Sequence, residues 1–212
     1  MTSVEGERRR RVPALAPDER RAALIAATIP LLREHGPDVS TRQIAQAAGV
    51  AEGTIFGVFS DKNTLLVTAL TSALDPRLTL DAIAAIDPAL DLRTRLIAAA
   101  ALINQRFTGN AQLITAARKL ALAHDADPEV RRRMSESRDA LLAALTAMIE
   151  PDAGRLRRSP GATAGLLLLF CAGSTHGPFG DPADVNAAEL VSLLLDGLLI
   201  RNDDNHGGAV RC

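Results

Sequence analysis

The chain has 212 residues, of which 47% are hydrophobic and only 2% aromatic, with neither Trp nor Tyr. Its apolar residues are mainly Ala and Leu, which favour helices, whereas strands favour the β-branched and aromatic residues that are scarce here. The composition therefore predicts an all-α protein. The net charge of −1 excludes DNA binding driven by overall positive charge, but not binding through a local basic cluster.

The N-terminal segment contains such a cluster, the unbroken arginine run Arg8–Arg11. Residues 1–16 are expected to form a flexible basic arm. Arms of this kind often follow the minor groove of DNA, but a solvated tail explains the same residues, and both interpretations stay open. Residues 202–212 are expected to form a flexible tail.

Several features predict a cytoplasmic protein that enters no membrane. The first residues contain no apolar signal-peptide core, and the apolar run Ala164–Gly173 is far too short to span a bilayer. Cys171 and Cys212 lack the spacing of metal ligands. Two cysteines without a signal peptide are typical of reduced thiols in the cytosol.

Apolar periodicity and Asp-Pro pairs mark the predicted helices. Asp is a good N-cap and Pro fits the first helical position, so several of these pairs are expected to open helices. The pairs are Asp75-Pro76, Asp87-Pro88, Asp127-Pro128 and Asp181-Pro182. The predicted helices cover residues 17–35, 41–48, 52–59, 63–74, 88–109, 111–123, 128–149, 161–175 and 184–201.

The last two predicted helices are apolar on nearly every side, so each must be buried on more than one face. We expect one face to pack on the chain's own core and the other on a partner, which gives a homodimer through residues 161–175 and 184–201. A charge at Leu194 or Leu198 is expected to dissociate or unfold this dimer. A central core helix in a monomer is the alternative.

Residues 40–59 have the pattern of a capped short helix, a turn at Gly49 and a second short helix. The positions expected to face inward are Ile44, Ala45, Ala48, Val50, Ile55 and Phe59. The positions of the second helix expected to face outward are Glu52, Gly53, Thr54, Phe56 and Gly57. Because small and polar residues at a helix start fit the major groove, the pattern predicts a helix-turn-helix at Thr41–Phe59. An ordinary corner between two helices is the alternative.

The segment from Arg21 to about Leu70 resembles the DNA-binding domain of the TetR family. The matching positions are Gly36, Thr41–Ala45, Ala48–Val50, Gly53–Phe56, Phe59, Lys62 and Leu65-Leu66. The resemblance implies a three-helix DNA-binding domain over residues 17–62 and a larger helical effector-binding and dimerisation domain over residues 63–201. It further implies a dimeric repressor that a small effector releases from a palindromic operator. The scarcity of aromatic residues and inward charges favours an apolar or amphipathic effector, and because no catalytic motif or phosphate-binding loop is found, we expect no cofactor and no catalytic activity.

Carried over by position, the resemblance implies residues that contact phosphates, a residue that reaches a base edge, and residues at the base-facing start of the second helix. Thr41, Thr54 and Lys62 would contact phosphates, and Arg42 would reach a base edge, guanine being the first guess. Glu52 and Gly53 would lie at the base-facing helix start, where Glu52 either accepts from cytosine or favours the helix N-terminus.

The chain departs from the family at positions 56–58. The family usually has Tyr where Phe56 stands, which leaves an apolar contact in place of a hydroxyl bond to phosphate. Gly57 and Val58 replace a pair that is commonly aromatic or polar, which weakens the expected hold on the DNA backbone.

Candidate residues for an effector pocket are polar or aromatic groups on the predicted helices between residues 88 and 175, or just beyond. They are Asn104, Phe107, Arg118, Met148, Phe170 and His176. A helical enzyme or metal-binding protein is the alternative function, with His124, Asp125 and Asp127 as a possible ligand cluster. A helix end followed by an N-cap explains those three residues equally.

Overall fold

The computed structural model describes residues 16–122, 128–176 and 186–198, which form helices joined by short turns and contain no strand. The described helices are α1 (Pro17–His35), α2 (Thr41–Ala48), α3 (Gly53–Phe56), α4 (Lys62–Ala73), α5 (Arg77–Ala84), α6 (Leu92–Gly109), α7 (Ala111–Leu122), α8 (Pro128–Ile149), α9 (Pro160–His176) and α10 (Ala187–Leu198). Short 3-10 turns follow α1 at Gly36–Asp38 and α8 at Glu150–Arg155. The prediction of an all-α fold is confirmed.

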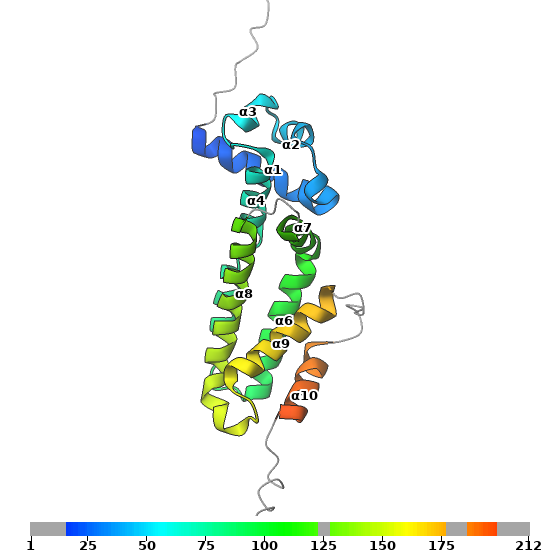
Figure 1. The fold of residues 1–212 in the computed structure, drawn as a ribbon. Helices are drawn as coiled ribbons and strands as arrows, with labels where there is room; N and C mark the ends of the chain where they lie inside the picture. Colours follow the sequence, from blue (N-terminus) through cyan, green and yellow to red (C-terminus); the bar gives the residue numbers. More distant parts are fainter. Residues whose placement is uncertain (1–15, 123–127, 177–185, 199–212) are drawn as a thin grey trace, which may run out of the picture.

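The helices form a small N-terminal unit at one end of a longer bundle (Figure 1). Helices α1, α2 and α3 make up that end, and α4 runs from it into the bundle, packing against α1, α7 and α8. Helices α6, α8, α9 and α10 pack on one another in the body of the bundle. Helix α4 therefore belongs to both parts of the molecule.

Side-chain caps fix the starts of several helices. Ser40 and Gln43 form a reciprocal capping box before α2, in which each side chain accepts from the other residue's backbone N–H. Asp61 accepts the backbone N–H of Thr64 at 2.7 Å and so caps α4. Asp91 caps α6 through Thr94 in the same way.

The segment between α4 and α6 differs from the prediction of one helix over residues 88–109. Helix α6 begins only at Leu92, because Asp91 rather than the Asp87-Pro88 pair caps it. The Asp75-Pro76 pair precedes a helix, α5, that was not predicted. There Asp75 accepts the backbone N–H of Arg77 at 2.9 Å.

Helix α3 is shorter than the predicted range of 52–59. Only residues Gly53–Phe56 are α-helical. The backbone N–H groups of Gly57 and Val58 bond to carbonyls three residues back, and that of Phe59 bonds to the Ile55 carbonyl at 2.8 Å. The chain thus continues as a tight turn after Phe56, and glycine at position 57 weakens the helix there.

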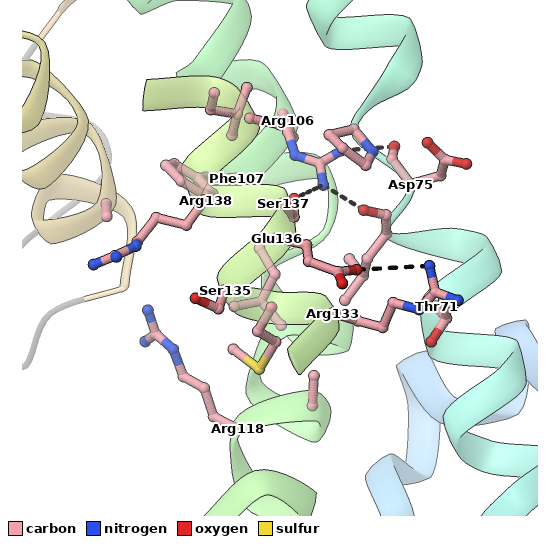
Figure 2. Close-up of a pocket in the computed structure, with 18 of the residues that line it drawn as sticks. Thr71, Asp75, Arg106, Phe107, Arg118, Arg133, Ser135, Glu136, Ser137 and Arg138 are labelled. Atoms are coloured by element: carbon pink, nitrogen blue, oxygen red, sulfur yellow. Dashed lines mark hydrogen bonds and ion pairs between the residues drawn. The ribbon is translucent and has the colours of Figure 1, made fainter. Parts of the chain in front are cut away.

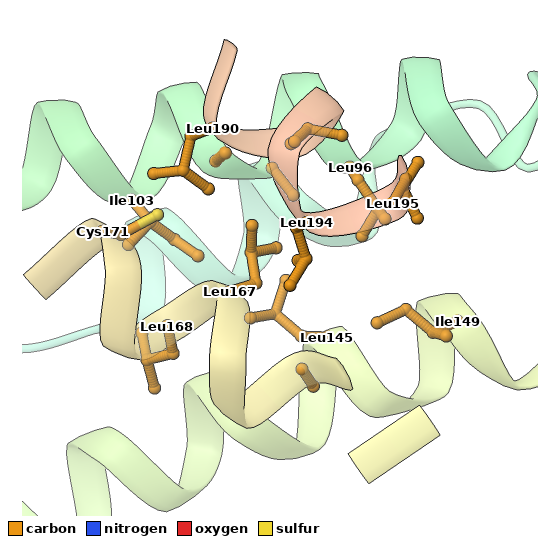
Figure 3. Packing of buried hydrophobic residues seen from close by; sticks show 14 of the residues in the cluster. Leu96, Ile103, Leu145, Ile149, Leu167, Leu168, Cys171, Leu190, Leu194 and Leu195 are labelled. Carbon is orange, nitrogen blue, oxygen red and sulfur yellow. The ribbon is translucent and has the colours of Figure 1, made fainter. Parts of the chain in front are cut away.

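Two apolar cores hold the molecule together. One joins α1–α4 to α7 and the start of α8, through buried residues such as Leu24, Leu66 and Leu113. The other lies among α6, α8, α9 and α10, where Leu145, Leu167 and Leu195 meet (Figure 3). Because α7 and the start of α8 belong to the bundle and also contribute to the first core, apolar side chains pack the N-terminal unit against the bundle.

Cys171 lies in the second core (Figure 3). Burial raises the pKa of its thiol to about 12, so the sulfur stays protonated and acts as a small apolar group.

A buried ion pair lies beside the second core, where α6 meets the turn after α8. Arg95 of α6 is 6% exposed and donates to the carboxylate of Asp152. The same guanidinium donates to the carbonyls of Leu90 at 3.0 Å and Met148 at 2.6 Å. The buried charge is therefore matched by a carboxylate and by two backbone carbonyls.

Helices α9 and α10 each present apolar residues to the core and to the surface. Leu194 is 5% exposed and belongs to the chain's own core, whereas Leu193 is 76% exposed. Leu169 and Phe170 of α9 are exposed as well. Of the two outcomes expected for a charge at Leu194, dissociation or unfolding, its burial in the core favours unfolding. The side chain of Leu198 lies outside the described residues.

Within the described residues, no helix combines the length and apolarity needed to cross a membrane.

Candidate nucleic-acid interface and ligand cavity

Buried side chains and a backbone hydrogen bond hold the turn between α2 and α3 in place. Ile44, Ile55 and Phe59 are buried, and the N–H of Val50 donates to the Ala45 carbonyl at 3.0 Å. Gly49 has φ 67°, the left-handed conformation that a side chain would strain. These contacts fix the angle between the two short helices.

A cation–π contact adds α1 to this support. The guanidinium of Arg21 lies 4.4 Å from the centre of the Phe59 ring. Phe59 therefore holds the segment after α3 against α1 in two ways: its ring is buried in the apolar core, and it contacts the Arg21 cation.

The predicted DNA-contacting residues lie together at the α2–α3 end of the molecule. Arg42, Glu52, Gly53, Phe56 and Gly57 are exposed there. The remaining predicted residues, which are partly buried, are Thr41, Thr54 and Lys62. The structure thus gathers at one end the Arg42 guanidinium of α2 and the Phe56 ring of α3, with Gly53 and Gly57 at the start and the end of α3.

Two of these predicted residues are bonded to each other. The Thr41 hydroxyl donates to the Glu52 carboxylate and ties the start of α2 to the residue before α3. A phosphate at Thr41 would have to replace a carboxylate that already accepts from it. The bond therefore gives Glu52 a structural role, which the sequence had not predicted.

Lys62 is the first residue of α4, and its ammonium donates to the Pro37 carbonyl at 3.1 Å. The bond joins the turn after α1 to the start of α4. Beside it, hydrogen bonds from the Thr64 backbone, the Ser60 hydroxyl and the Thr64 hydroxyl hold the pKa of Asp61 below its ordinary value. This capping carboxylate is therefore charged at neutral pH.

The N-terminal unit is not basic by itself. Residues 16–62 contain five Arg and Lys side chains and six Asp and Glu side chains. The arginine run Arg8–Arg11 lies outside the described residues. Within residues 16–62, attraction of phosphate would therefore have to come from individual cations such as Arg42 and Lys62 and not from net charge.

A cavity of about 1000 Å³ opens between the end of α4 and helices α6, α7, α8 and α9. Most of its lining is apolar, including Leu70, Ile114, Met134, Leu141 and Leu168. The charged side chains at its wall are Asp75, Arg106, Arg118, Arg133, Glu136 and Arg138 (Figure 2). An apolar hollow with a few charged groups is typical of a small-molecule site.

Of the predicted pocket residues, Phe107 and Arg118 line this cavity. Asn104, Met148 and Phe170 do not. Asn104 has a buried Oδ1 with no hydrogen-bond partner among the described residues. The backbone carbonyl of Met148 accepts from Arg95.

Phe170 is exposed on α9. His176 ends α9, and its side chain lies outside the described residues.

Sequence reasoning missed Arg106, which reaches the cavity from α6. A signal existed, because Arg106 follows Ala99 and Ile103 at the spacing of one apolar helix face. Arg95 interrupts the same helix in the same way, and its charge is matched internally. The pattern alone does not distinguish a structural arginine from a cavity arginine.

The alternative metal cluster of His124, Asp125 and Asp127 lies outside the described residues. Among the residues that are described, no group of three or more potential ligands is placed to hold a metal ion.

Comparison with known proteins identifies the N-terminal segment. Residues 24–69 match the family model of the bacterial regulatory proteins of the tetR family. No curated protein matches the chain.

Solved structures extend the likeness over most of the chain. A protein described as a TetR-family transcriptional regulator, from Mesorhizobium loti, has a TM-score of 0.69 at 18% identity, covering 88% of this chain and 100% of that one. A transcriptional regulator from Pseudomonas aeruginosa has a TM-score of 0.64 at 22% identity, covering 86% and 91%. The regulator FadR from Bacillus subtilis, in complex with stearoyl-CoA, has a TM-score of 0.59 at 16% identity, covering 82% and 95%. At these identities the likeness establishes a shared fold.

Proposed function

We propose that this chain, whose residues 24–69 match the tetR family of bacterial regulatory proteins, is a DNA-binding transcriptional regulator that acts as a homodimeric repressor. It leaves a palindromic operator when a small apolar or amphipathic molecule fills the cavity. The observation that carries the proposal is the course of α4. The helix begins beside the DNA-binding turn with Lys62 and ends at the cavity with Leu70 and Leu74.

The proposed functions divide the chain at the start of α4. Residues 17–62 bind DNA, and residues 63–201 bind the effector and a second subunit. Arg42 and the exposed start of α3 meet base edges, while Thr41, Thr54 and Lys62 approach phosphates. The bond from Lys62 to the Pro37 carbonyl holds the ammonium at the surface of this end. Acting on chromosomal DNA, the protein would work in the cytoplasm.

The exposed apolar residues of α9 and α10 support the dimer. Leu169, Phe170 and Leu193 lie on the surface although both helices also contribute to the core. A stable dimer of this kind buries more than about 2,000 Å² in total. Its two-fold symmetry requires an inverted repeat in the DNA, with half-sites about one helical turn or a multiple apart.

Control of DNA binding would pass through α4. A molecule in the cavity touches the C-terminal half of α4, so a displacement there changes the separation of the two DNA-binding ends. An effector that lowers operator affinity ten- to a hundredfold needs about 1.4–2.7 kcal/mol of coupling. By reciprocity, operator DNA then weakens effector binding by the same factor.

The apolar lining and the charged side chains of the cavity together favour an amphipathic effector. The structural neighbour FadR was crystallised with stearoyl-CoA, a molecule of that kind.

The test of the proposal is binding to the DNA upstream of the protein's own gene, measured by fluorescence anisotropy. We expect a dissociation constant of about 10⁻⁸ M or tighter, and binding at least about a thousandfold weaker to unrelated DNA of equal length. Equal affinity for the two DNAs would contradict the proposal.

Arg42→Ala is expected to cost roughly 1–3 kcal/mol of specific binding, because it removes a side chain suited to a guanine edge. The loss should be confined to one base position per half-site. Anisotropy with operator variants substituted at single positions measures it. A loss spread evenly over all variants would assign Arg42 to the phosphates instead.

Lys62→Ala is expected to weaken binding to all DNA sequences alike and to reduce the salt slope, log K against log salt concentration, by about one. Lys119 is also a lysine at a helix surface, but it is exposed on α7, outside α2, α3 and the start of α4, and it provides the matched control. Its replacement by Ala should leave the slope unchanged. If Lys62→Ala changes neither affinity nor slope, the predicted phosphate contact is wrong.

A further inference from the structure

The Arg106 guanidinium bridges the end of α4 and the cavity. It donates to the Asp75 carbonyl at 3.0 Å, to the Leu74 carbonyl and, at 3.4 Å, to the Ser137 hydroxyl of α8. Leu74 is the C-cap of α4, so the cation sits at the negative end of that helix. The same side chain lines the cavity (Figure 2).

The positive charge of Arg106 has no carboxylate within hydrogen-bond distance among the described residues. The Asp75 carboxylate is nearby, but it accepts from the Arg77 side chain at 2.6 and 2.8 Å. Those hydrogen bonds hold the pKa of Asp75 below its ordinary value. Burial lowers the pKa of Arg106, and the opposing effect of the nearby Asp75 charge is the smaller of the two.

Arg95 and Arg106 differ in whether a carboxylate partners the guanidinium. Both arginines stand on α6, and both donate to backbone carbonyls at the end of another helix or turn. Arg95 also binds a carboxylate, that of Asp152, and is closed off from solvent. Arg106 has the same kind of carbonyl partners, but where Arg95 has its carboxylate, Arg106 faces a cavity.

The other charges at the cavity do not supply the missing anion. Glu136 pairs with Arg132 and Arg133. Arg118 has no ion pair among the described residues, and in Figure 2 its guanidinium and that of Arg138 lie toward the same side of the cavity. The wall is therefore richer in cations than in free carboxylates.

We propose that the cavity binds an amphipathic anion whose acidic group accepts hydrogen bonds from Arg106, with its apolar body against the leucines and Met134. The inference rests on the proposed function and names the class of its effector. A guanidinium has five N–H donors in a planar fork, and those not directed at Leu74, Asp75 and Ser137 would make the first contact with the acidic group.

The acidic group would compete with the end of α4 for the same cation. A charge-assisted bond to a carboxylate is stronger than a bond to a carbonyl, so Arg106 turns toward the ligand and the Leu74 and Asp75 carbonyls lose their donor. The C-terminal end of α4 is then held less firmly. An uncharged molecule of the same shape fills the cavity without this effect.

The test is calorimetric titration of the full chain with dodecanoate and with 1-dodecanol, which share an apolar body and differ in charge. The wild-type chain is expected to bind dodecanoate at least about tenfold more tightly than the alcohol. Arg106→Gln should abolish this preference while leaving the affinity for the alcohol unchanged. Arg133→Gln is the matched control, since Arg133 lines the same cavity but pairs with Glu129 and Glu136; it should keep the preference.

Three results would overturn the proposal: no binding of dodecanoate, equal affinity for the two molecules, or a preference that survives Arg106→Gln. If Arg106→Gln does not fold, as judged by circular dichroism, Arg106→Lys decides. It keeps the charge without the planar fork and should weaken dodecanoate by about tenfold and leave dodecanol unaffected; an unchanged dodecanoate affinity would also overturn the proposal. Because these titrations contain no DNA, their failure is distinct from a failure to bind operator.

Discussion

Replacing Leu193 by glutamate is expected to produce a folded monomer that has lost most of its operator affinity. Leu193 is exposed on α10, which packs on α9, and α9 also exposes Leu169 and Phe170. In the proposed dimer a carboxylate at position 193 would be desolvated, whereas in the monomer it would stay in water. Without the dimer, each DNA-binding end must bind its half-site alone, which lowers affinity by about 10²- to 10⁴-fold. Light scattering measures the mass, circular dichroism the fold, and anisotropy the DNA binding.

Leu194→Glu is the contrasting variant, one residue further along the same helix. Its side chain lies in the chain's own core with Leu145 and Leu167 (Figure 3), so the charge should unfold the subunit. The pair separates an interface effect from a core effect. A Leu193→Glu protein that remains a dimer would show that this face of α10 is not the interface.

Replacing Asp152 by alanine is expected to cost about 3–5 kcal/mol of the free energy of unfolding, because it leaves the Arg95 guanidinium buried without its carboxylate. The carbonyls of Leu90 and Met148 would remain as partners but do not neutralise the charge. Urea denaturation at neutral pH, followed by circular dichroism, measures the loss.

Arg155→Ala provides the control, because Arg155 pairs with the same carboxylate at 2.7 Å from a side chain that is 64% exposed. An exposed ion pair contributes only about 0–1 kcal/mol. Asp152→Ala should therefore be far more damaging than Arg155→Ala. Similar losses for the two variants would mean that the Arg95–Asp152 pair does not stabilise the bundle.

The N-terminal fold could be predicted from the sequence because its signals are local. The Ser40–Gln43 capping box and the apolar pair at Ile55 and Phe59 each specify a short segment without distant partners. The left-handed turn at Gly49 is equally local. Helix boundaries were less predictable where two caps compete, as at Asp87 and Asp91.

The cavity and the surface of the bundle depend on contacts far apart in the chain, and the sequence predicted them less completely. Phe107 and Arg118 were predicted for the cavity, but Arg106 was not, because its role depends on where α4 ends. Leu193 and Leu194 are identical in type and adjacent, so only the packing of α10 on α6 and α9 separates surface from core.

The most direct test of specific DNA recognition by the α2–α3 end is selection of binding sites from a pool of random DNA by the purified protein. We predict that the selected sequences converge on an inverted repeat, with half-sites about one helical turn or a multiple apart. The residues proposed to recognise it, Arg42 and the start of α3, belong to α2 and α3 in the N-terminal unit (Figure 1). Sequences that show no common motif, or a single motif without two-fold symmetry, would contradict the account.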